Sequence, residues 1–226
     1  MLLVRDSMTR EVVTVGPETS AAEALALCRG TRIRHLPVLQ GDRLVGMISD
    51  RDLRSATPAL GDPARAEALQ SIRVADEMAR DVVTTLPDDP IEDAAMTMYE
   101  RKIGCLPVVD GERLVGILTS SDVLRAFVRL VGVHEPGSRL EVALPNRAGS
   151  LAEVAGIVRD EEVNLVSVLA SSEHEDEDGR RVAVLRLATI NPTAVVEGLG
   201  AAGYAVLWPP GADNAGPGPG SDTGRA

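Results

Sequence analysis

The stretch that decides the fold is HLPVLQGDRLVGMISDRDL, residues 35–53, because the chain contains it twice. Seventy residues later the sequence reads CLPVVDGERLVGILTSSDV, residues 105–123. Working outward, residues 4–54 align with residues 74–124 without a gap, and 19 of these 51 positions are identical. An ungapped register over that length indicates a duplicated unit. Because only two copies are present, we expect a two-fold pair rather than a solenoid.

Each copy predicts the element order βαββα from its apolar periodicity and turn residues. Thr19 is the expected N-cap of the first helix. In the first copy, we expect a strand at 12–15, a helix at 19–29, two hairpin strands at 36–39 and 44–48, and a closing helix from 49 onward. In the second copy, the same elements are expected at 82–85, 91–101, 106–109, 114–118 and from 119 to about 131. The linker between the copies should become helical at 65–71.

The doubled motif resembles a tandem pair of CBS domains. The resemblance covers residues 1–131, and its repetition makes it more specific than one short motif. It implies a disc-like module with two clefts between the units and an adenosine-containing ligand. The expected regulatory ligands are AMP, ADP, ATP or S-adenosylmethionine, with no other cofactor.

Two Ser/Thr-x-x-Asp motifs, Ser49 with Asp52 and Thr119 with Asp122, follow a strand and open a helix. A hydroxyl beside free helix N–H groups suits a phosphate, and an ionised Asp can accept two hydrogen bonds from a ribose diol. In the CBS family these two positions touch phosphate and ribose. The same motif is also close to a capping box, which serves only helix stability. Both interpretations stay open.

Basic residues distinguish the two copies. Arg34 and His35 precede the Leu-Pro of the first copy, whereas Gly104 and Cys105 stand there in the second. The resemblance places residues 34, 35 and 105, together with Thr19, beside the nucleotide. We therefore expect unequal clefts, with the cleft of the first copy binding phosphate more tightly. His35 would add a pH dependence near its ordinary pKa of about 6.5.

From residue 138 the pattern changes to βαββαβ, an order typical of ferredoxin-like domains. The run LPNRAGSLAEVAGIVRDEEVNLVSV, residues 144–168, resembles the opening of an ACT domain, a regulatory module that often binds an amino acid. The resemblance implies an amino-acid site at Asn146 and Gly149, with Asn164 at a paired-domain interface. A tight turn at Gly149 and a plain strand end at Asn164 are the alternatives.

The fold class expected for the whole chain is α+β. The expected divisions are CBS domains at 1–58 and 72–134, a linker at 59–71, an ACT domain at 138–208 and a disordered tail at 209–226. An acidic hairpin loop is expected at 171–180, and we expect it to be solvated rather than to hold a metal ion.

Composition excludes several function classes. The 34 acidic residues outnumber the 23 basic ones, for a net charge of −11, which argues against nucleic acid or an anionic membrane as a partner. No apolar run approaches the roughly 20 residues of a membrane span, so we expect a soluble cytoplasmic protein. Two cysteines and three histidines form no metal-binding pattern, and no catalytic motif is present, so we do not expect an enzyme.

The expected function is regulatory. The arrangement resembles the acetoin-utilisation type of bacterial CBS–ACT proteins, and it implies a sensor of adenine nucleotides that acts on an unidentified regulated protein or across a homodimer. In such a homodimer, CBS domains would pair with CBS domains and ACT domains with ACT domains. The alternative is a scaffold that dimerises and carries vestigial nucleotide sites.

Overall fold

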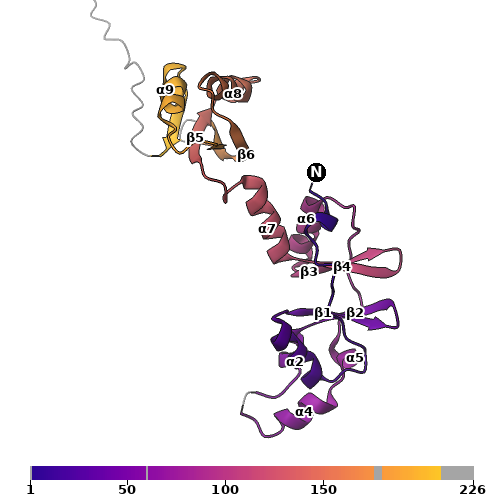
Figure 1. Ribbon diagram of the computed structural model, residues 1–226. Helices are drawn as coiled ribbons and strands as arrows, with labels where there is room; N and C mark the ends of the chain where they lie inside the picture. The colour runs from indigo at the N-terminus through magenta and orange to yellow at the C-terminus, as the bar shows by residue number, and fades with distance from the viewer. Residues whose placement is uncertain (1, 60, 176–179, 210–226) are drawn as a thin grey trace, which may run out of the picture. The chain divides into compact units, whose positions relative to one another are not determined.

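The computed structural model describes residues 2–59, 61–175 and 180–209 (Figure 1). It divides into two compact units, Met1–Ala126 and Phe127–Ala226. The first unit contains the duplicated motif, and the second contains the elements that follow it. No helix in the described ranges is long and apolar enough to cross a membrane.

The first unit repeats one set of elements. The first copy supplies α1 (Val4–Ser7), α2 (Ala21–Thr31), β1 (His35–Gln40), β2 (Arg43–Ser49) and α3 (Asp50–Ser55). After the linker helix α4 (Arg65–Ser71), the second copy supplies α5 (Val74–Glu77), α6 (Ile91–Arg101), β3 (Cys105–Asp110), β4 (Arg113–Thr119) and α7 (Ser120–Val131). The four expected hairpin strands and the expected helices are therefore present.

Two expected strands are reduced to single bridges. Val15 pairs in parallel with Val38, and Thr85 pairs with Val108. Each of these residues makes two backbone hydrogen bonds to its partner strand. A proline follows two positions later in both copies, and its missing N–H and fixed φ stop the ladder.

The strands of the first unit form one antiparallel sheet in the order β1-β2-β4-β3. Each hairpin belongs to one repeat, and the sheet is joined across the repeats between β2 and β4. That junction has a single Cα pair, Arg43 with Arg113. The hydrogen-bonded sheet alone therefore connects the repeats weakly, and other contacts must supply the rest of the interface.

Those contacts come from the leading segments of the two repeats, residues 4–9 and 74–79, which are exchanged. Val4 lies in the hydrophobic core of the second repeat, whereas Val74 and Met78 lie in the core of the first. The backbone of Thr9 pairs with Ile117, and that of Ala79 pairs with Met47. Each repeat is thus completed by a segment that precedes the other in sequence.

Two glycines make room for this exchange. A Cβ on Gly46 would lie 2.5 Å from Met78 Sδ, and a Cβ on Gly116 would lie 2.5 Å from Met8 Sδ. The Cβ on Gly46 would also lie 3.1 Å from the carbonyl oxygen of Ala79, and the Cβ on Gly116 would lie 3.1 Å from that of Thr9. A side chain at either glycine would therefore displace the methionine and force the carbonyl of the crossing segment to shift by a few tenths of an ångström.

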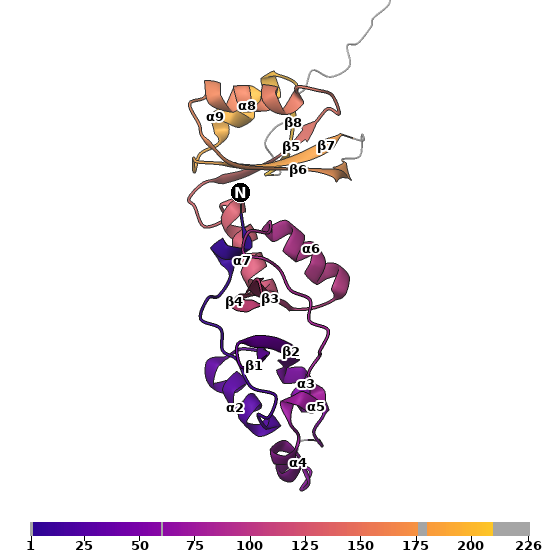
Figure 2. The ribbon, with the colours of Figure 1, turned by 90° about the vertical axis from the view of Figure 1, so that its right-hand side faces the viewer.

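The second unit has the order βαββαβ. Its elements are β5 (Ser138–Leu144), α8 (Ser150–Asp160), β6 (Leu165–Glu175), β7 (Arg181–Leu187), α9 (Thr193–Ala201) and β8 (Ala205–Trp208). The sheet order β6-β7-β5-β8, with every pair antiparallel, is the ferredoxin-like arrangement. Figure 2 shows α8 and α9 covering one face of this sheet. The core lies between them and includes Leu140, Leu185 and Leu199.

One boundary in this unit differs from the expectation. The acidic hairpin loop was expected to begin at residue 171, but β6 continues to Glu175, which pairs with Arg181 of β7. The pairing of β6 with β7 has an irregularity between Ala170 and Glu175 and resumes at Glu175. The remaining loop residues 176–179 lie outside the described residues, as does the expected disordered tail from residue 210 onward.

Candidate functional site

The first unit contains a cavity of about 1020 Å³ that is lined by both repeats. It includes five of the predicted nucleotide-site residues: Arg34, His35, Ser49, Asp52 and Cys105. Thr19, Thr119 and Asp122 do not line it. The cavity is large enough for a nucleotide, since ligand pockets typically measure about 300–1,000 Å³.

Ser49 and Asp52 form the capping box of α3. Asp52 Oδ2 accepts hydrogen bonds from the Ser49 amide at 2.9 Å and from Ser49 Oγ at 2.6 Å, and Ser49 Oγ accepts one from the Asp52 amide at 3.2 Å. The capping interpretation is therefore confirmed. The side chain of Asp52 is nevertheless exposed, and no described residue donates to its Oδ1. That oxygen can accept a hydrogen bond from a ligand.

Thr119 and Asp122 form the same box at the start of α7. Asp122 Oδ2 accepts from the Thr119 amide at 2.9 Å and from Thr119 Oγ1 at 2.6 Å. In contrast to Asp52, Asp122 is only 7% exposed, and its Oδ1 pairs with Arg125 at 3.3 Å. Both oxygens of the second aspartate are thus occupied within the protein.

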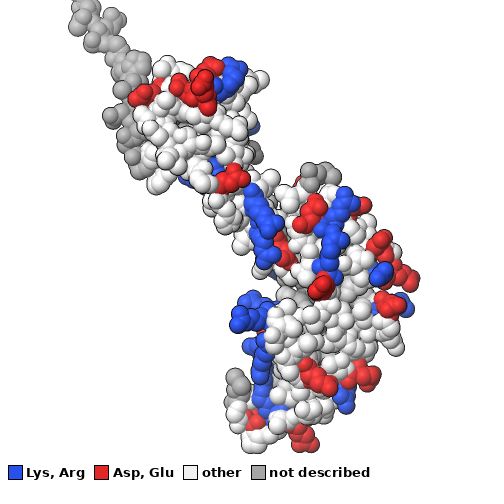
Figure 3. All heavy atoms as spheres, viewed as in Figure 1, with Lys and Arg blue, Asp and Glu red and all other residues white. Residues whose placement is uncertain are grey.

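Basic side chains from both repeats line the cavity. Arg34, Arg51 and Lys102 have no ion-pair partner among the described residues, whereas Arg54 pairs with Asp50 at 3.0 Å. The acidic lining residues besides this paired Asp50 are Asp52 and Asp81. Figure 3 shows Lys and Arg side chains along the left-hand edge of the first unit and Asp and Glu side chains on other parts of the same face. The cavity can therefore attract an anion.

Gly104 and Cys105 of the second copy line the same cavity as Arg34 and His35 of the first. A Cβ on Gly104 would lie 3.1 Å from Cε1 and 3.2 Å from Nε2 of His35, so the imidazole packs directly on this glycine. The two hairpins bring their first residues together where the repeats meet. A unit-by-unit assignment of cleft residues misses that contact.

Two titratable groups in the cavity are shifted by burial. Burial lowers the pKa of His35 below its ordinary value, outweighing the opposite effect of Asp50. The imidazole is therefore more readily neutral than the sequence interpretation assumed. Burial also raises the pKa of the Cys105 thiol to about 12, so this cysteine stays protonated and acts as a packing residue.

Sequence reasoning missed Lys102, Arg51 and Asp81. Lys102 caps the C-terminus of α6 in the left-handed conformation, with φ of 54°, and Arg32 caps α2 in the same way, with φ of 57°. The alignment of the repeats places basic residues at these two equivalent positions, and this was the available signal. Only Lys102 lines the cavity.

Thr19 was expected to be the N-cap of the first helix, but it does not cap a helix. Ser20 is the N-cap of α2 and forms a reciprocal capping box with Glu23. Thr19 Oγ1 instead accepts a hydrogen bond from the Gly16 amide at 3.1 Å. The box needs an acidic partner three residues after its hydroxyl residue, and only Ser20 has one.

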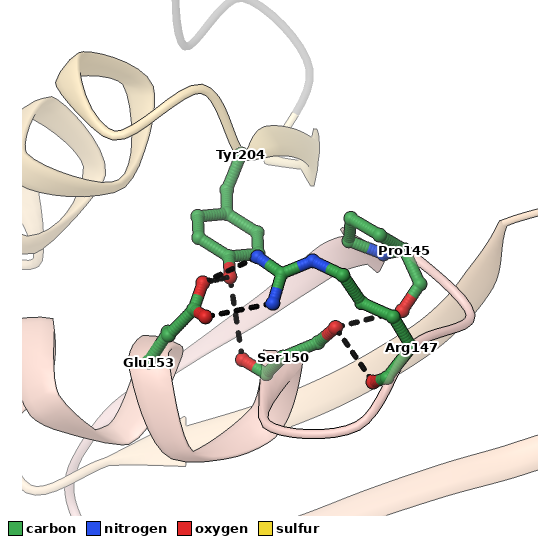
Figure 4. A network of polar contacts seen from close by, with 5 residues as sticks. All are labelled: Pro145, Arg147, Ser150, Glu153 and Tyr204. Carbon is green, nitrogen blue, oxygen red and sulfur yellow. Dashed lines mark hydrogen bonds and ion pairs between the residues drawn. The ribbon is translucent and has the colours of Figure 1, made fainter.

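In the second unit, the loop before α8 is held by its own side chains (Figure 4). Arg147 donates two 2.7 Å hydrogen bonds to the carboxylate of Glu153, and the hydroxyl of Tyr204 donates to Glu153 Oε2 at 2.5 Å. The Arg147 contact is the main cause that lowers the pKa of Glu153 to about 2. Ser150 Oγ donates to the carbonyls of Pro145 and Arg147.

The three residues predicted for the amino-acid site lie around this loop or at a strand end. Gly149 adopts a φ of 90° at the N-cap of α8, a conformation that favours glycine. Asn146 is exposed in the same loop. The Asn164 carbonyl accepts a 2.9 Å hydrogen bond from the Ala188 amide, as a strand end requires. No group of three or more possible metal ligands occurs among the described residues of either unit.

Comparison with known proteins assigns the repeated unit. Residues 4–58 and 73–129 match the CBS domain family. The CBS domain-containing protein YhcV of Bacillus subtilis is 33% identical over 54% of this chain and 84% of its own length. The chain belongs to the CBS domain family. Its CBS pair also resembles the crystal structure of a Vibrio cholerae protein that is assigned as the acetoin utilization protein AcuB. The two are 32% identical with a TM-score of 0.51, and the match covers 60% of this chain and 99% of that one.

The CBS pair also matches parts of larger proteins and ligand-bound structures. An inosine-5′-monophosphate dehydrogenase of Methanocaldococcus jannaschii is 34% identical over 59% of this chain but only 25% of its own length. Its activity is therefore not transferred to this chain. Two further solved CBS pairs, each with a TM-score of 0.49, contain adenosine ligands: one AMP, the other 5′-methylthioadenosine and S-adenosyl-L-methionine.

Proposed function

We propose that this protein is a regulatory sensor that binds an adenine nucleotide in the cavity of its CBS pair. The observation that carries the proposal is the composite cavity of about 1020 Å³, which combines an apolar wall with a carboxylate oxygen and cationic side chains that have no partner among the described residues. These are the groups that a ribose, a phosphate and a base require.

The polar contacts can be assigned by chemistry. Asp52 Oδ1 would accept from the ribose hydroxyls, because its other oxygen is engaged by Ser49. Arg34 and Arg51 from the first repeat and Lys102 from the second would neutralise phosphate oxygens. Charge-assisted contacts from both repeats would make the ligand a bridge between them.

The base would lie against the apolar part of the lining. Met47, Val82, Val83, Ile103 and Pro107 supply aliphatic surface, and no Phe, Tyr or Trp is among the described lining residues of the cavity. Aliphatic walls can bury the faces of an adenine ring by the hydrophobic effect without stacking. This cavity, rather than the buried Asp122, is therefore the proposed nucleotide site. Thr119 and Asp122 keep their capping role in the proposal, and Thr19 has no ligand role.

For the second unit we propose an ACT domain, with 138–208 as its boundaries and Asn146 and Gly149 as the loop that would meet an amino acid. The βαββαβ order and the left-handed Gly149 support the proposal. The domain would either bind an amino acid or only dimerise. The remaining boundaries, CBS domains at 1–58 and 72–134 with a linker at 59–71, belong to the same proposal.

The output would be a conformational change passed to an unidentified regulated protein or across a homodimer. A ligand can shift such an equilibrium only by binding two arrangements of the repeats with different affinity. A cavity lined by both repeats provides that difference, because its dimensions depend on how the repeats meet.

Isothermal titration calorimetry of the full chain with AMP, ADP, ATP and S-adenosylmethionine tests the proposal. We expect saturable binding of at least one of these ligands, weakened in Arg34→Ala. If none binds at millimolar concentration, the nucleotide site is vestigial and the protein is a scaffold. A thermal-shift screen of the twenty amino acids tests the ACT domain separately, and no shift would leave it a dimerisation module.

A further inference from the structure

The two repeats differ at the oxygen atom that each capping box leaves unused. Asp52 Oδ1 has no donor among the described residues, whereas Asp122 Oδ1 pairs with Arg125 Nη1 at 3.3 Å. Seventy residues before Arg125, the first repeat has Ser55, which lines the cavity. The repeat with the short side chain thus has an exposed aspartate, whereas the repeat with the long cationic one has an aspartate that is only 7% exposed.

Apart from this contact, the duplication supplies the parts of a second site. The valines at 82–83, which line the cavity, have valine counterparts at 12–13. Lys102, which also lines the cavity, has Arg32 as its counterpart, and both end a helix in the left-handed conformation. Arg32 has no ion-pair partner among the residues that the structure describes. An aliphatic wall and a cationic cap are therefore available to each aspartate.

The exchanged leading segments are placed alike at the two capping boxes. The backbone of Thr9 pairs with Ile117 of β4, just as that of Ala79 pairs with Met47 of β2. Each of these strands ends two residues later, at the hydroxyl residue of its capping box. The segment after Thr9 therefore leaves its strand at the same point relative to the second box as the segment after Ala79 does relative to the first.

The contact of Arg125 with Asp122 has the geometry of a displaceable one. The side chain of Arg125 is 62% exposed, and its 3.3 Å distance is longer than the about 2.7–2.9 Å typical of a charge-assisted hydrogen bond. The guanidinium can therefore leave without opening the core. A phosphate would offer the released guanidinium two parallel hydrogen bonds, and a ribose would offer Asp122 Oδ1 a hydroxyl donor. An adenine nucleotide thus carries replacement partners for both groups.

We propose that Arg125 is a displaceable plug that closes a second adenine-nucleotide site at Asp122. The inference rests on the proposed function and goes beyond it, because there Asp122 serves only as a cap. With the plug in place, the CBS pair binds one nucleotide at Asp52, and a second nucleotide must break the Arg125 contact before it binds. The second site therefore fills only at higher nucleotide concentration, so one side chain separates two steps of occupancy.

Calorimetry of the full chain with AMP tests the plug in an Asp52→Asn background, which removes the ribose contact of the first site. The double variant Asp52→Asn/Arg125→Ser, which copies the first repeat at residue 125, should bind AMP about tenfold more tightly than Asp52→Asn alone. Loss of a positive charge by itself would weaken binding of an anion, so a gain is specific to opening the site. Adding Asp122→Asn should abolish the gain. The matched control Arg129→Ser removes the same charge at an exposed residue one turn further along α7, and it should give no gain.

Circular dichroism melting establishes that each variant is folded. Should Arg125→Ser not fold, Arg125→Gln removes the charge but keeps part of the aliphatic stem, and it should give a smaller gain of the same sign. A double variant that binds AMP no better than Asp52→Asn overturns the inference, as does a gain that survives Asp122→Asn or appears equally in Arg129→Ser. Failure of the proposed function is distinguishable, because a wild type that binds no AMP counts against the first site, whereas the plug is judged by the gain in the double variant.

Discussion

Asp52 and Asp122 occupy equivalent capping boxes, so replacing each by Asn separates a ligand contact from a structural one. Asn keeps one carbonyl oxygen for the hydroxyl of the box but loses the charge and presents N–H donors in place of the second oxygen. The structure distinguishes the two sites by that second oxygen. Asp52 lines the cavity and has no donor to that oxygen among the described residues, whereas Asp122 pairs it with Arg125 at 3.3 Å.

The expected magnitudes follow from these contacts. At Asp52, loss of a charge-assisted hydrogen bond to the ribose should weaken nucleotide binding by about 1.5–3 kcal/mol, or roughly 10- to 150-fold. Its exposed capping role should cost only about 0.3–1 kcal/mol of stability. At the buried Asp122, binding should change by less than about twofold, while loss of the Arg125 pair should cost about 1.5–3 kcal/mol of stability.

Calorimetry with the tightest-binding nucleotide and urea denaturation of both variants measure these quantities. The expected pattern is crossed: Asp52→Asn loses affinity and keeps stability, and Asp122→Asn does the opposite. Equal loss of affinity in both variants would show that a second cleft contributes equally. Unchanged affinity in Asp52→Asn, with the fold intact, would refute the ribose contact and leave the capping role alone.

Three further perturbations have matched controls or a defined sign. Lys102→Ala should weaken ATP binding more than adenosine binding, whereas Arg32→Ala, at the equivalent cap of the first repeat, should change neither when both are measured by calorimetry. Because the pKa of Glu153 is lowered to about 2, its ionised carboxylate stabilises the second unit at pH values above the ordinary pKa of 4.5, and this stabilisation is lost as the pH falls toward 2. The unfolding free energies of Glu153→Gln and of the wild type, measured by urea denaturation, should therefore converge over that pH range. Gly46→Ala should cost about 1–3 kcal/mol because its Cβ would meet Met78 Sδ at 2.5 Å, and adding Met78→Ala should restore part of that loss in the same assay.

The elements of the fold were predictable because their signals are local. Residues 91–101 and 65–71 form helices with the predicted bounds, since apolar spacing and flanking Gly or Pro residues act within a few turns. The hairpin strands followed from apolar runs around Gly41 and Gly111, both of which adopt positive φ. Thr19 failed as a cap because Ser20 has the better-placed Glu23.

The composition of the cavity was not predictable in the same way, because it depends on pairings between residues far apart in sequence. Nothing local shows that residues 74–79 cross to the first repeat, or that Gly104 supports the ring of His35. The glycines at 46 and 116 were visible as identical positions of the repeat, but their partners Met78 and Met8 emerge only when the segments are placed in space. A repeat alignment therefore finds equivalent residues without showing which of them share a site.

The exchange of leading segments also explains why a ligand in this cavity could act as a regulator. The sheet joins the repeats through one Cα pair, so much of their association depends on the crossing segments. The segment that begins at Val74 packs in the first repeat, and Ala79, Asp81, Val82 and Val83 in its continuation line the cavity. Lys102 and Asp52 line the same cavity, so a nucleotide bound there would share the cavity with this segment. Its binding free energy would therefore depend on the seating of the crossing segment, and by linkage the bound nucleotide would alter how firmly the two repeats are held together.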